Sequence, residues 1–254
     1  MDKPASGRRT FLIQTALAGT AGLAAAASFA EPGAPSRTLQ GIEPWQEGQA
    51  DAPPAVDGTE FRYFSPAERT FIEAAVSRLI PNDDVGPGAV EAGVPFFLDR
   101  QLAGPFGHGH RYYLLGPWKK GTPEQGYQSR FTPAELYRAA IKAIDEYTGK
   151  TFGGKKFADL SEGDRDKLLK DLEKGSVELE GGVDGKSFFK MLLQNTKEGY
   201  FGDPIYGGNK DMGAWKMIGF PGAHYDYSDW VTRHGEKVTV AAVGLKGRPG
   251  WREA

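Results

Sequence analysis

The chain has 254 residues, of which 39% are hydrophobic and 25% charged, so it is long and apolar enough to bury a core. Its 31 Lys and Arg residues against 33 Asp and Glu residues give a formal charge of -2. This balance argues against a nucleic-acid-binding protein, because such proteins normally carry a basic surplus. There is no cysteine, which excludes a disulfide, a Cys-ligated iron–sulfur cluster, a Cys-x-x-Cys-His haem attachment and a cysteine nucleophile.

Residues 1–30 are predicted to be an export signal rather than part of the fold. A short basic start precedes an Ala-, Gly- and Leu-rich stretch at 12–29, and small residues suitable for cleavage end at Ala30. An Arg-Arg pair followed by Thr-Phe-Leu matches the twin-arginine pattern, which is an address read by a receptor. The predicted targeting residues are Arg8, Arg9, Phe11 and Leu12. The alternative is a retained membrane helix, for which the segment is nearly long enough but rich in Ala and Gly.

Cleavage of this signal would remove three basic groups and one acid, which lowers the charge of the mature chain from -2 to near -4. No second apolar segment of the sequence is long enough to cross a bilayer. We therefore expect a periplasmic product that reaches the membrane only through partners. The twin-arginine translocase generally exports folded proteins, either because they carry a cofactor or because a partner travels with them.

The rest of the chain divides into three regions. Residues 31–60 are rich in Pro and lack hydrophobic periodicity, so they are predicted to be a flexible linker or arm. Residues 61–227 are predicted to form an all-α domain, an irregular arrangement of five or six helices with long loops rich in Gly, Pro and aromatic residues. Residues 228–254 form a C-terminal extension, in which the β-branched run 237–243 is the one candidate strand.

Two predicted helices share one start signal. Ser65-Pro66-Ala67-Glu68 and Thr132-Pro133-Ala134-Glu135 each combine an N-cap, a proline at the first helical position and a glutamate that closes a capping box. Their expected stops are Pro81 and Gly149. Further helices are expected at 94–102, from Ser161 to Gly175, and at about 185–198 with a stop at Gly199. We interpret their apolar stripes first as core.

No motif indicates independent catalysis. The sequence has no G-x-G-x-x-G after a predicted strand, no Walker A sequence and no G-x-S-x-G. His108 and His110 alternate within a Gly/Pro loop, and in an extended segment they could share a metal ion, although loop histidines are usually solvated. Asn82-Asp83-Asp84 lacks the full set of calcium ligands and is interpreted as a helix stop.

Three carboxylates lie close together in the sequence. Glu198, Asp203 and Asp211 fall within one predicted loop region and could act as an acid–base pair. Because they neighbour Lys197 and Lys210, we expect surface ion pairs instead. An independent exported enzyme that uses these carboxylates, or the histidine pair with a metal, remains an alternative.

The most distinctive segment is the region 199–227, which is dense in aromatic, Gly and Pro residues. Its aromatic side chains either fill the core or form an exposed surface of the kind favoured at protein interfaces, and both can hold at once. A sugar-binding module that stacks its ligand on Trp215 and Tyr206 is a further alternative. The predicted partner-interface residues are Tyr200, Phe201, Asp203, Pro204, Tyr206, Gly207, Gly208, Asn209, Trp215, Phe220, Pro221 and Gly222.

Several short motifs occur in an order along the chain that is more specific than any one of them. They lie at 64–68, 79–83, 86–89, 99–104, 116–117 and 126–128, and the most specific are at 196–204, 206–209 and 219–222. In these motifs, over about residues 60–227 and in its leader, the sequence resembles the gluconate 2-dehydrogenase subunit 3 family. These are the small (gamma) subunits of membrane-bound gluconate 2-dehydrogenases, with relatives in fructose and 2-ketogluconate dehydrogenases.

The resemblance implies a non-catalytic subunit of an oxidoreductase complex. In such complexes a large flavoprotein subunit binds FAD and oxidises the sugar or sugar acid, and a multihaem cytochrome c subunit passes the electrons to quinone. The small subunit carries the twin-arginine signal and helps to fold or export the flavoprotein. FAD and c-type haem are therefore expected in the partner subunits, and no cofactor is expected in this chain.

Overall fold

The computed structural model describes residues 60–110, 112, 114, 116, 121–127, 129–224, 227–236 and 242–245. These residues contain six α-helices and no named strand, which confirms the predicted all-α class for the described part of the chain. The helices are α2 (Pro66–Leu79), α3 (Val94–Ala103), α4 (Pro133–Thr151), α5 (Glu162–Lys174), α6 (Gly185–Phe201) and α7 (Gly213–Ile218). The predicted signal, and the predicted linker except Glu60, lie outside the described residues.

Both predicted capping boxes are present. The Ser65 hydroxyl accepts a hydrogen bond from the Glu68 N–H, while the Glu68 carboxylate accepts one from the Ser65 N–H. Thr132 and Glu135 make the same reciprocal pair at the start of α4. At the start of each of these two helices, the capping box thus gives partners to two backbone N–H groups that would otherwise lack them.

Two predicted helix ends are wrong. Helix α4 continues beyond Gly149 to Thr151, and α6 continues through Gly199 to Phe201. Gly199 is a packing residue rather than a stop, because a Cβ built on it would lie 2.6 Å from Cδ1 of Phe97 in α3. The missing side chain lets α6 approach α3 closely.

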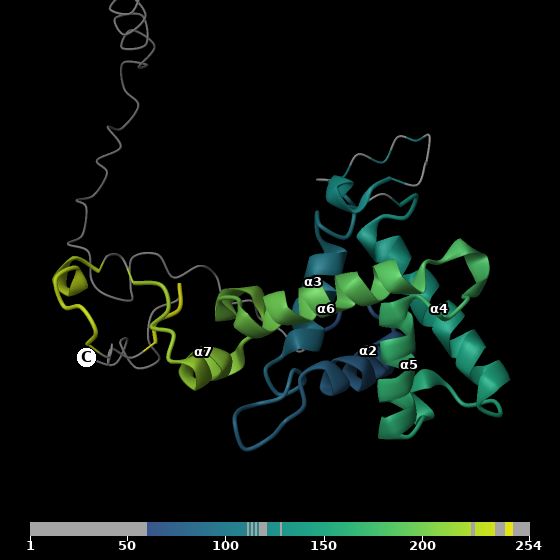
Figure 1. Cartoon of the computed structure of the whole chain (residues 1–254), viewed down its shortest axis with the longest axis horizontal. Coiled ribbons are helices and arrows are strands. Elements are labelled where there is room, and N and C mark those ends of the chain that lie inside the picture. The colour runs from purple at the N-terminus through teal and green to yellow at the C-terminus, as the bar shows by residue number, and fades with distance from the viewer. Residues whose placement is uncertain are drawn as a thin grey trace, which may run out of the picture. The chain divides into compact units, whose positions relative to one another are not determined.

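Helix α6 is the centre of the packing. It contacts α2, α3, α4, α5 and α7, and Figure 1 shows it running across the helical body with these neighbours gathered along it. Phe188 of α6 is fully buried and lies edge-on to Tyr137 of α4, with ring centroids 5.4 Å apart. The Phe71 ring of α2 lies 6.5 Å from Phe188 and 4.7 Å from Phe157 between ring centroids, so aromatic rings join α6 to both α2 and α4.

A buried carboxylate attaches the segment before α2 to α3. Asp99 is fully buried and accepts hydrogen bonds from the backbone N–H groups of Arg62 (2.7 Å), Tyr63 (2.8 Å) and Phe64 (2.8 Å). Three donors replace the water that a buried charge loses. Asp99 therefore determines where the chain enters the helical body.

The predicted strand at 237–243 lies mostly outside the described residues. Its Val243 is described, and it forms an isolated parallel bridge with Gly222. Gly222 adopts a φ of 82°, and a Cβ there would lie 2.1 Å from the Val243 carbonyl oxygen. Among the described helices, none combines the length and the apolar character that a membrane crossing requires.

Candidate functional site

The aromatic region after α6 folds into short helical turns: η4 (Pro204–Tyr206), η5 (Lys210–Met212) and α7. Gly207 and Asn209, between η4 and η5, and Asp211 and Met212, within η5, have positive φ. Left-handed backbone at three residues other than glycine is uncommon and requires support from the surrounding contacts.

The inner side of this region is part of the core. Tyr200 and Trp215 are buried; the Tyr200 hydroxyl donates to the Pro87 carbonyl at 2.6 Å, and the Trp215 indole donates to the Phe201 carbonyl at 2.7 Å. Asn209 is fully buried, donating to the Gly202 carbonyl and accepting from the Ala214 N–H. These bonds hold the turns against the end of α6. Because Trp215 is buried, it offers no open face on which a sugar could stack.

Four large apolar side chains of the region are exposed. Phe201 is 40% exposed, Tyr206 51%, Ile218 56% and Phe220 44%; we refer to these four residues as the apolar surface. Phe220 lies edge-on to Trp215 at 5.1 Å, so an exposed ring rests on a buried one. Some aromatic residues of the region therefore fill the core and others are exposed, and the interface role of the exposed ones stays a prediction.

The remaining predicted interface residues shape the backbone beneath the apolar surface. The Asp203 carboxylate accepts from the Ile205 N–H (2.9 Å), which caps η4, and from the Leu245 N–H (2.8 Å) of the C-terminal extension. A Cβ on Gly208 would lie 2.1 Å from the Gly199 carbonyl oxygen, and one on Gly207 would lie 2.7 Å from the Phe96 ring. Pro204 and Pro221 are half-buried.

The structure does not bring the three predicted carboxylates together. Glu198 lies on α6 and not in a loop, Asp203 caps η4, and Asp211 is exposed. Glu198 accepts hydrogen bonds from Gln194 and Asn195, whereas Asp203 accepts from backbone N–H groups. Within the described residues, the expected ion pairs with Lys197 and Lys210 do not occur.

The histidine pair is not arranged as an extended segment would arrange it. His108 and His110 lie in consecutive turns. The backbone N–H of His108 donates to the Gly104 carbonyl, and that of His110 donates to the Pro105 carbonyl. Their ring centroids are 6.1 Å apart, both are exposed, and His108 Nδ1 lies 2.8 Å from the Gly104 carbonyl oxygen. Among the described residues, no group of three or more His, Cys, Asp or Glu side chains is placed to bind a metal.

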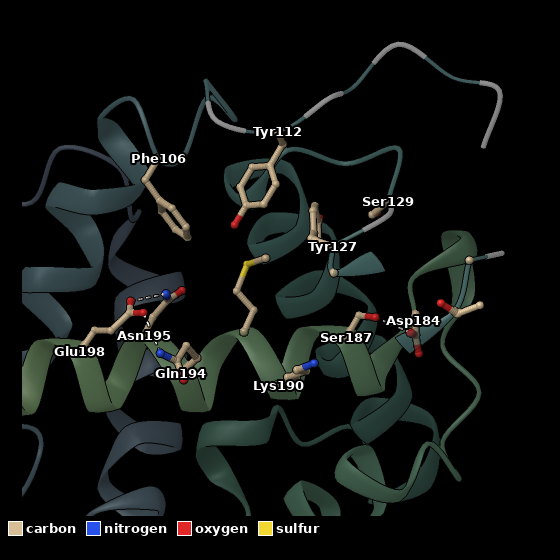
Figure 2. A pocket seen from close by; sticks show the side chains of 14 residues that line it. Phe106, Tyr112, Tyr127, Ser129, Asp184, Ser187, Lys190, Gln194, Asn195 and Glu198 are labelled. Atoms are coloured by element: carbon tan, nitrogen blue, oxygen red, sulfur yellow. Dashed lines mark hydrogen bonds between the residues drawn. The ribbon is translucent and has the colours of Figure 1, made fainter. Parts of the chain in front are cut away.

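A pocket of about 410 Å³ lies along α6, separate from the apolar surface (Figure 2). One wall is a face of α6 and its N-cap, and the other comes from the loop between α3 and α4. The lining residues are Phe106, Tyr112, Gly121, Thr122, Gly126, Tyr127, Ser129, Asp184, Ser187, Lys190, Met191, Gln194, Asn195 and Glu198.

A chain of hydrogen bonds from the core holds a carboxylate in this pocket. The hydroxyl of fully buried Tyr137 donates to Asn195 Oδ1 at 3.0 Å, which orients the amide so that Nδ2 donates to Glu198 at 2.9 Å. Gln194 donates to the other Glu198 oxygen at 2.9 Å. Burial, reinforced by the charge of Glu198, raises the pKa of Tyr137 well above its ordinary value, so its hydroxyl remains a donor.

The facing wall is aromatic. Tyr112 lies between Phe106 and Tyr127, with ring centroids 6.5 Å and 5.0 Å away respectively. Burial raises the pKa of Tyr112, and the nearby negative charge of Glu198 raises it further. Of the pocket residues, sequence reasoning singled out only Glu198 as a functional candidate, while Gly126 and Tyr127 entered only through the motif at 126–128.

Comparison with known proteins identifies one family. The family model described as gluconate 2-dehydrogenase subunit 3 matches residues 66–222, which run from the start of α2 to the residue that pairs with Val243. No curated protein matches the chain, and no solved structure does.

Proposed function

The chain belongs to the gluconate 2-dehydrogenase subunit 3 family, and we propose from this that it is the accessory, non-catalytic subunit of such a dehydrogenase complex. Its role in this proposal is to bind the FAD-containing catalytic subunit and to escort that subunit through folding and twin-arginine export to the periplasm. A multihaem cytochrome c would complete the complex. FAD and haem would belong to these partners.

The observation that carries the proposal is the apolar surface. Phe201, Tyr206, Ile218 and Phe220 are between 40% and 56% exposed, on turns that buried hydrogen bonds hold in place. Exposed apolar and aromatic side chains on a rigid support are typical of interface hot spots, each of which contributes about 2 kcal/mol or more to binding. A stable interface here would bury at least about 1,000 Å².

Co-expression of this chain with its flavoprotein partner tests the proposal. We expect the flavoprotein to copurify with the wild-type chain and to lose its export and FAD content when the chain is omitted. The triple variant Tyr206→Ser/Ile218→Ser/Phe220→Ser should fold with an unchanged circular dichroism spectrum, since these side chains are exposed, but its affinity for the flavoprotein should fall by at least about 100-fold.

Val231→Ser is the matched control, because it removes a side chain that is 68% exposed and lies outside residues 66–222. It should leave copurification intact. A flavoprotein that is exported, binds FAD and turns over equally well without this chain would contradict the proposal.

A further inference from the structure

We propose that the pocket along α6 is a binding site for an organic cation, an ammonium or guanidinium group on an alkyl body, with Glu198 as its counter-ion. This site is distinct from the apolar surface and does not depend on the proposed partner. The proposal follows from how the carboxylate is held, from the aromatic wall that faces it and from the charges around the pocket.

The Glu198 carboxylate is held in place before any ligand arrives. Its two oxygens accept from Gln194 and Asn195 at 2.9 Å each, and Asn195, only 4% exposed, is itself oriented by the buried Tyr137 hydroxyl. A carboxylate oxygen can accept more than one hydrogen bond, so the fixed group retains acceptor capacity for a ligand donor. Because the side chain is already ordered, a ligand does not bear the entropy of ordering it.

The opposite wall is aromatic, and aromatic rings can contact both a cation and an alkyl body. The rings of Phe106, Tyr112 and Tyr127 form a continuous row, and Figure 2 shows Tyr112 and Phe106 directed toward the face of α6 that carries Asn195 and Glu198. Aromatic faces carry the negative part of the ring quadrupole and attract ammonium and guanidinium groups. The same faces offer apolar contact to an alkyl body.

The charges that line the pocket also favour a cation. Among the described residues that line the pocket, two are negative, Asp184 and Glu198, and one is positive, Lys190. Asp184 is occupied as the N-cap of α6, where it accepts from the Lys186 N–H and the Ser187 hydroxyl. Lys190 is eight residues from Glu198 on the same helix, about 12 Å along its axis, which exceeds the distance over which exposed charges act strongly at physiological salt.

The pocket volume of about 410 Å³ lies within the usual range for small-ligand sites, so it admits a cation with an attached body of several carbon atoms. The same chemistry could be presented by a free amine or by a basic side chain of another protein. These two sources share the recognition group and differ in what is attached to it.

Ligand-observed NMR titration of the full chain with n-butylguanidinium, n-butylammonium, n-butylurea, butyrate and glucitol tests the inference. The two cations should bind about tenfold or more tightly than n-butylurea, which has a similar shape without the charge. Binding of butyrate or glucitol that equals or exceeds that of the cations would overturn the proposal, and so would the absence of any cation binding at millimolar concentrations.

Three variants locate the site. Glu198→Gln should weaken n-butylguanidinium binding about tenfold, because it removes the charge and retains the shape. Glu173→Gln, on an exposed position of α5 outside the pocket, should not change it. Lys190→Met should strengthen cation binding by roughly twofold, since it removes the one positive charge among the described residues that line the pocket. A loss of cation binding in Lys190→Met would contradict the charge assignment even if Glu198→Gln failed to fold.

N-acetyl-arginine-N-methylamide distinguishes the two sources. If it binds as tightly as n-butylguanidinium, the pocket accepts an arginine side chain presented by another polypeptide. If only the free cations bind, the ligand is a small molecule.

Discussion

Asp99 shows how one charged side chain can be stable in the core of this protein. It is fully buried, yet it accepts hydrogen bonds from three consecutive backbone N–H groups, at residues 62–64. Hydrogen bonds to a charged acceptor contribute more than neutral ones, and leaving the donors unpaired in the core would be costly. The entry of the chain into the helical domain therefore depends on this single carboxylate.

We predict that Asp99→Asn lowers the free energy of unfolding by about 3 kcal/mol. The amide keeps one acceptor oxygen but directs an NH₂ group toward N–H donors. Urea denaturation followed by circular dichroism measures the change. Asp84→Asn, at an exposed position between α2 and α3, is the control and should alter stability by less than about 0.5 kcal/mol. Equal stability of the two variants would show that the three hydrogen bonds contribute nothing.

Asp145 has a different effect on stability. Its carboxylate accepts from the Phe157 N–H at 3.0 Å, but burial is the larger influence and raises the pKa of Asp145 above its ordinary value. The folded state therefore holds this proton more tightly than the unfolded state does. The stabilisation that Asp145 provides is complete below its pKa in the unfolded state and is lost as the pH rises through its pKa in the folded state. At neutral pH, therefore, the ionised carboxylate destabilises the fold.

Asp145→Asn should consequently raise the Tm at pH 7, because the amide oxygen can still accept from Phe157 and no charge is buried. Below about pH 2.5, where the carboxyl of both states is almost fully protonated, the two proteins should unfold at the same temperature. Thermal unfolding at both pH values measures this difference. A variant that is less stable than wild type at pH 7 would mean that the charged hydrogen bond outweighs the cost of burial.

At the scale of elements, glycines determine how closely the segments after α6 approach it. A Cβ on Gly208 would lie 2.1 Å from the Gly199 carbonyl oxygen, so the turn before η5 lies directly against the helix backbone. Gly199 in turn lies against Phe97 of α3, where a Cβ would be 2.6 Å from the ring. These two close contacts pack the turn against α6 and α6 against α3, and so fix the position of the segment that carries the apolar surface.

Gly208→Ala should lower the free energy of unfolding by about 2 to 3 kcal/mol, because the atom it would displace belongs to the backbone. Gly163→Ala should have the opposite effect on the free energy of unfolding, because this glycine lies in α5 and an added Cβ would have nothing within 4 Å. It should stabilise the protein by about 0.5 to 1 kcal/mol through helix propensity. Chemical denaturation of both variants compares them directly, and stabilisation by both would contradict the close packing at 208.

For the whole molecule, the folded domain and the predicted export signal have separate tasks in the proposed function. The family match begins at residue 66, inside the described helices, whereas the twin-arginine pair lies at Arg8 and Arg9. The domain would bind the flavoprotein, and the signal would send both through the translocase as one folded cargo.

Arg8→Lys/Arg9→Lys should therefore leave both this chain and the flavoprotein in the cytoplasm, with their association intact. The change preserves charge but not the pattern that the receptor reads. Cell fractionation and copurification measure the two properties separately. If the flavoprotein is still exported with the double variant, the escort role is contradicted. Binding at the apolar surface is tested separately by the triple variant Tyr206→Ser/Ile218→Ser/Phe220→Ser.

Local signals account for the parts of the fold that sequence reasoning predicted. The starts of α2 and α4 follow from Ser65 and Thr132 with their capping partners, because an N-cap, a proline and a glutamate act within one turn. The stop at Gly175 also holds, where the backbone is left-handed. The stop predicted at Gly199 failed, because the same residue type also serves close packing, and its contact Phe97 lies more than 100 residues away in the sequence.

The amino-acid sequence by itself determined the helical class, the main helix starts and the family, because capping, periodicity and short motifs are properties of neighbouring residues. Only the tertiary structure decided which aromatic residues face outward: Trp215 and Phe220 are five residues apart, yet one is buried and the other exposed. It also joined Tyr112 to Glu198 across one pocket. Such placements depend on how the whole chain packs around α6, and no local pattern contains that information.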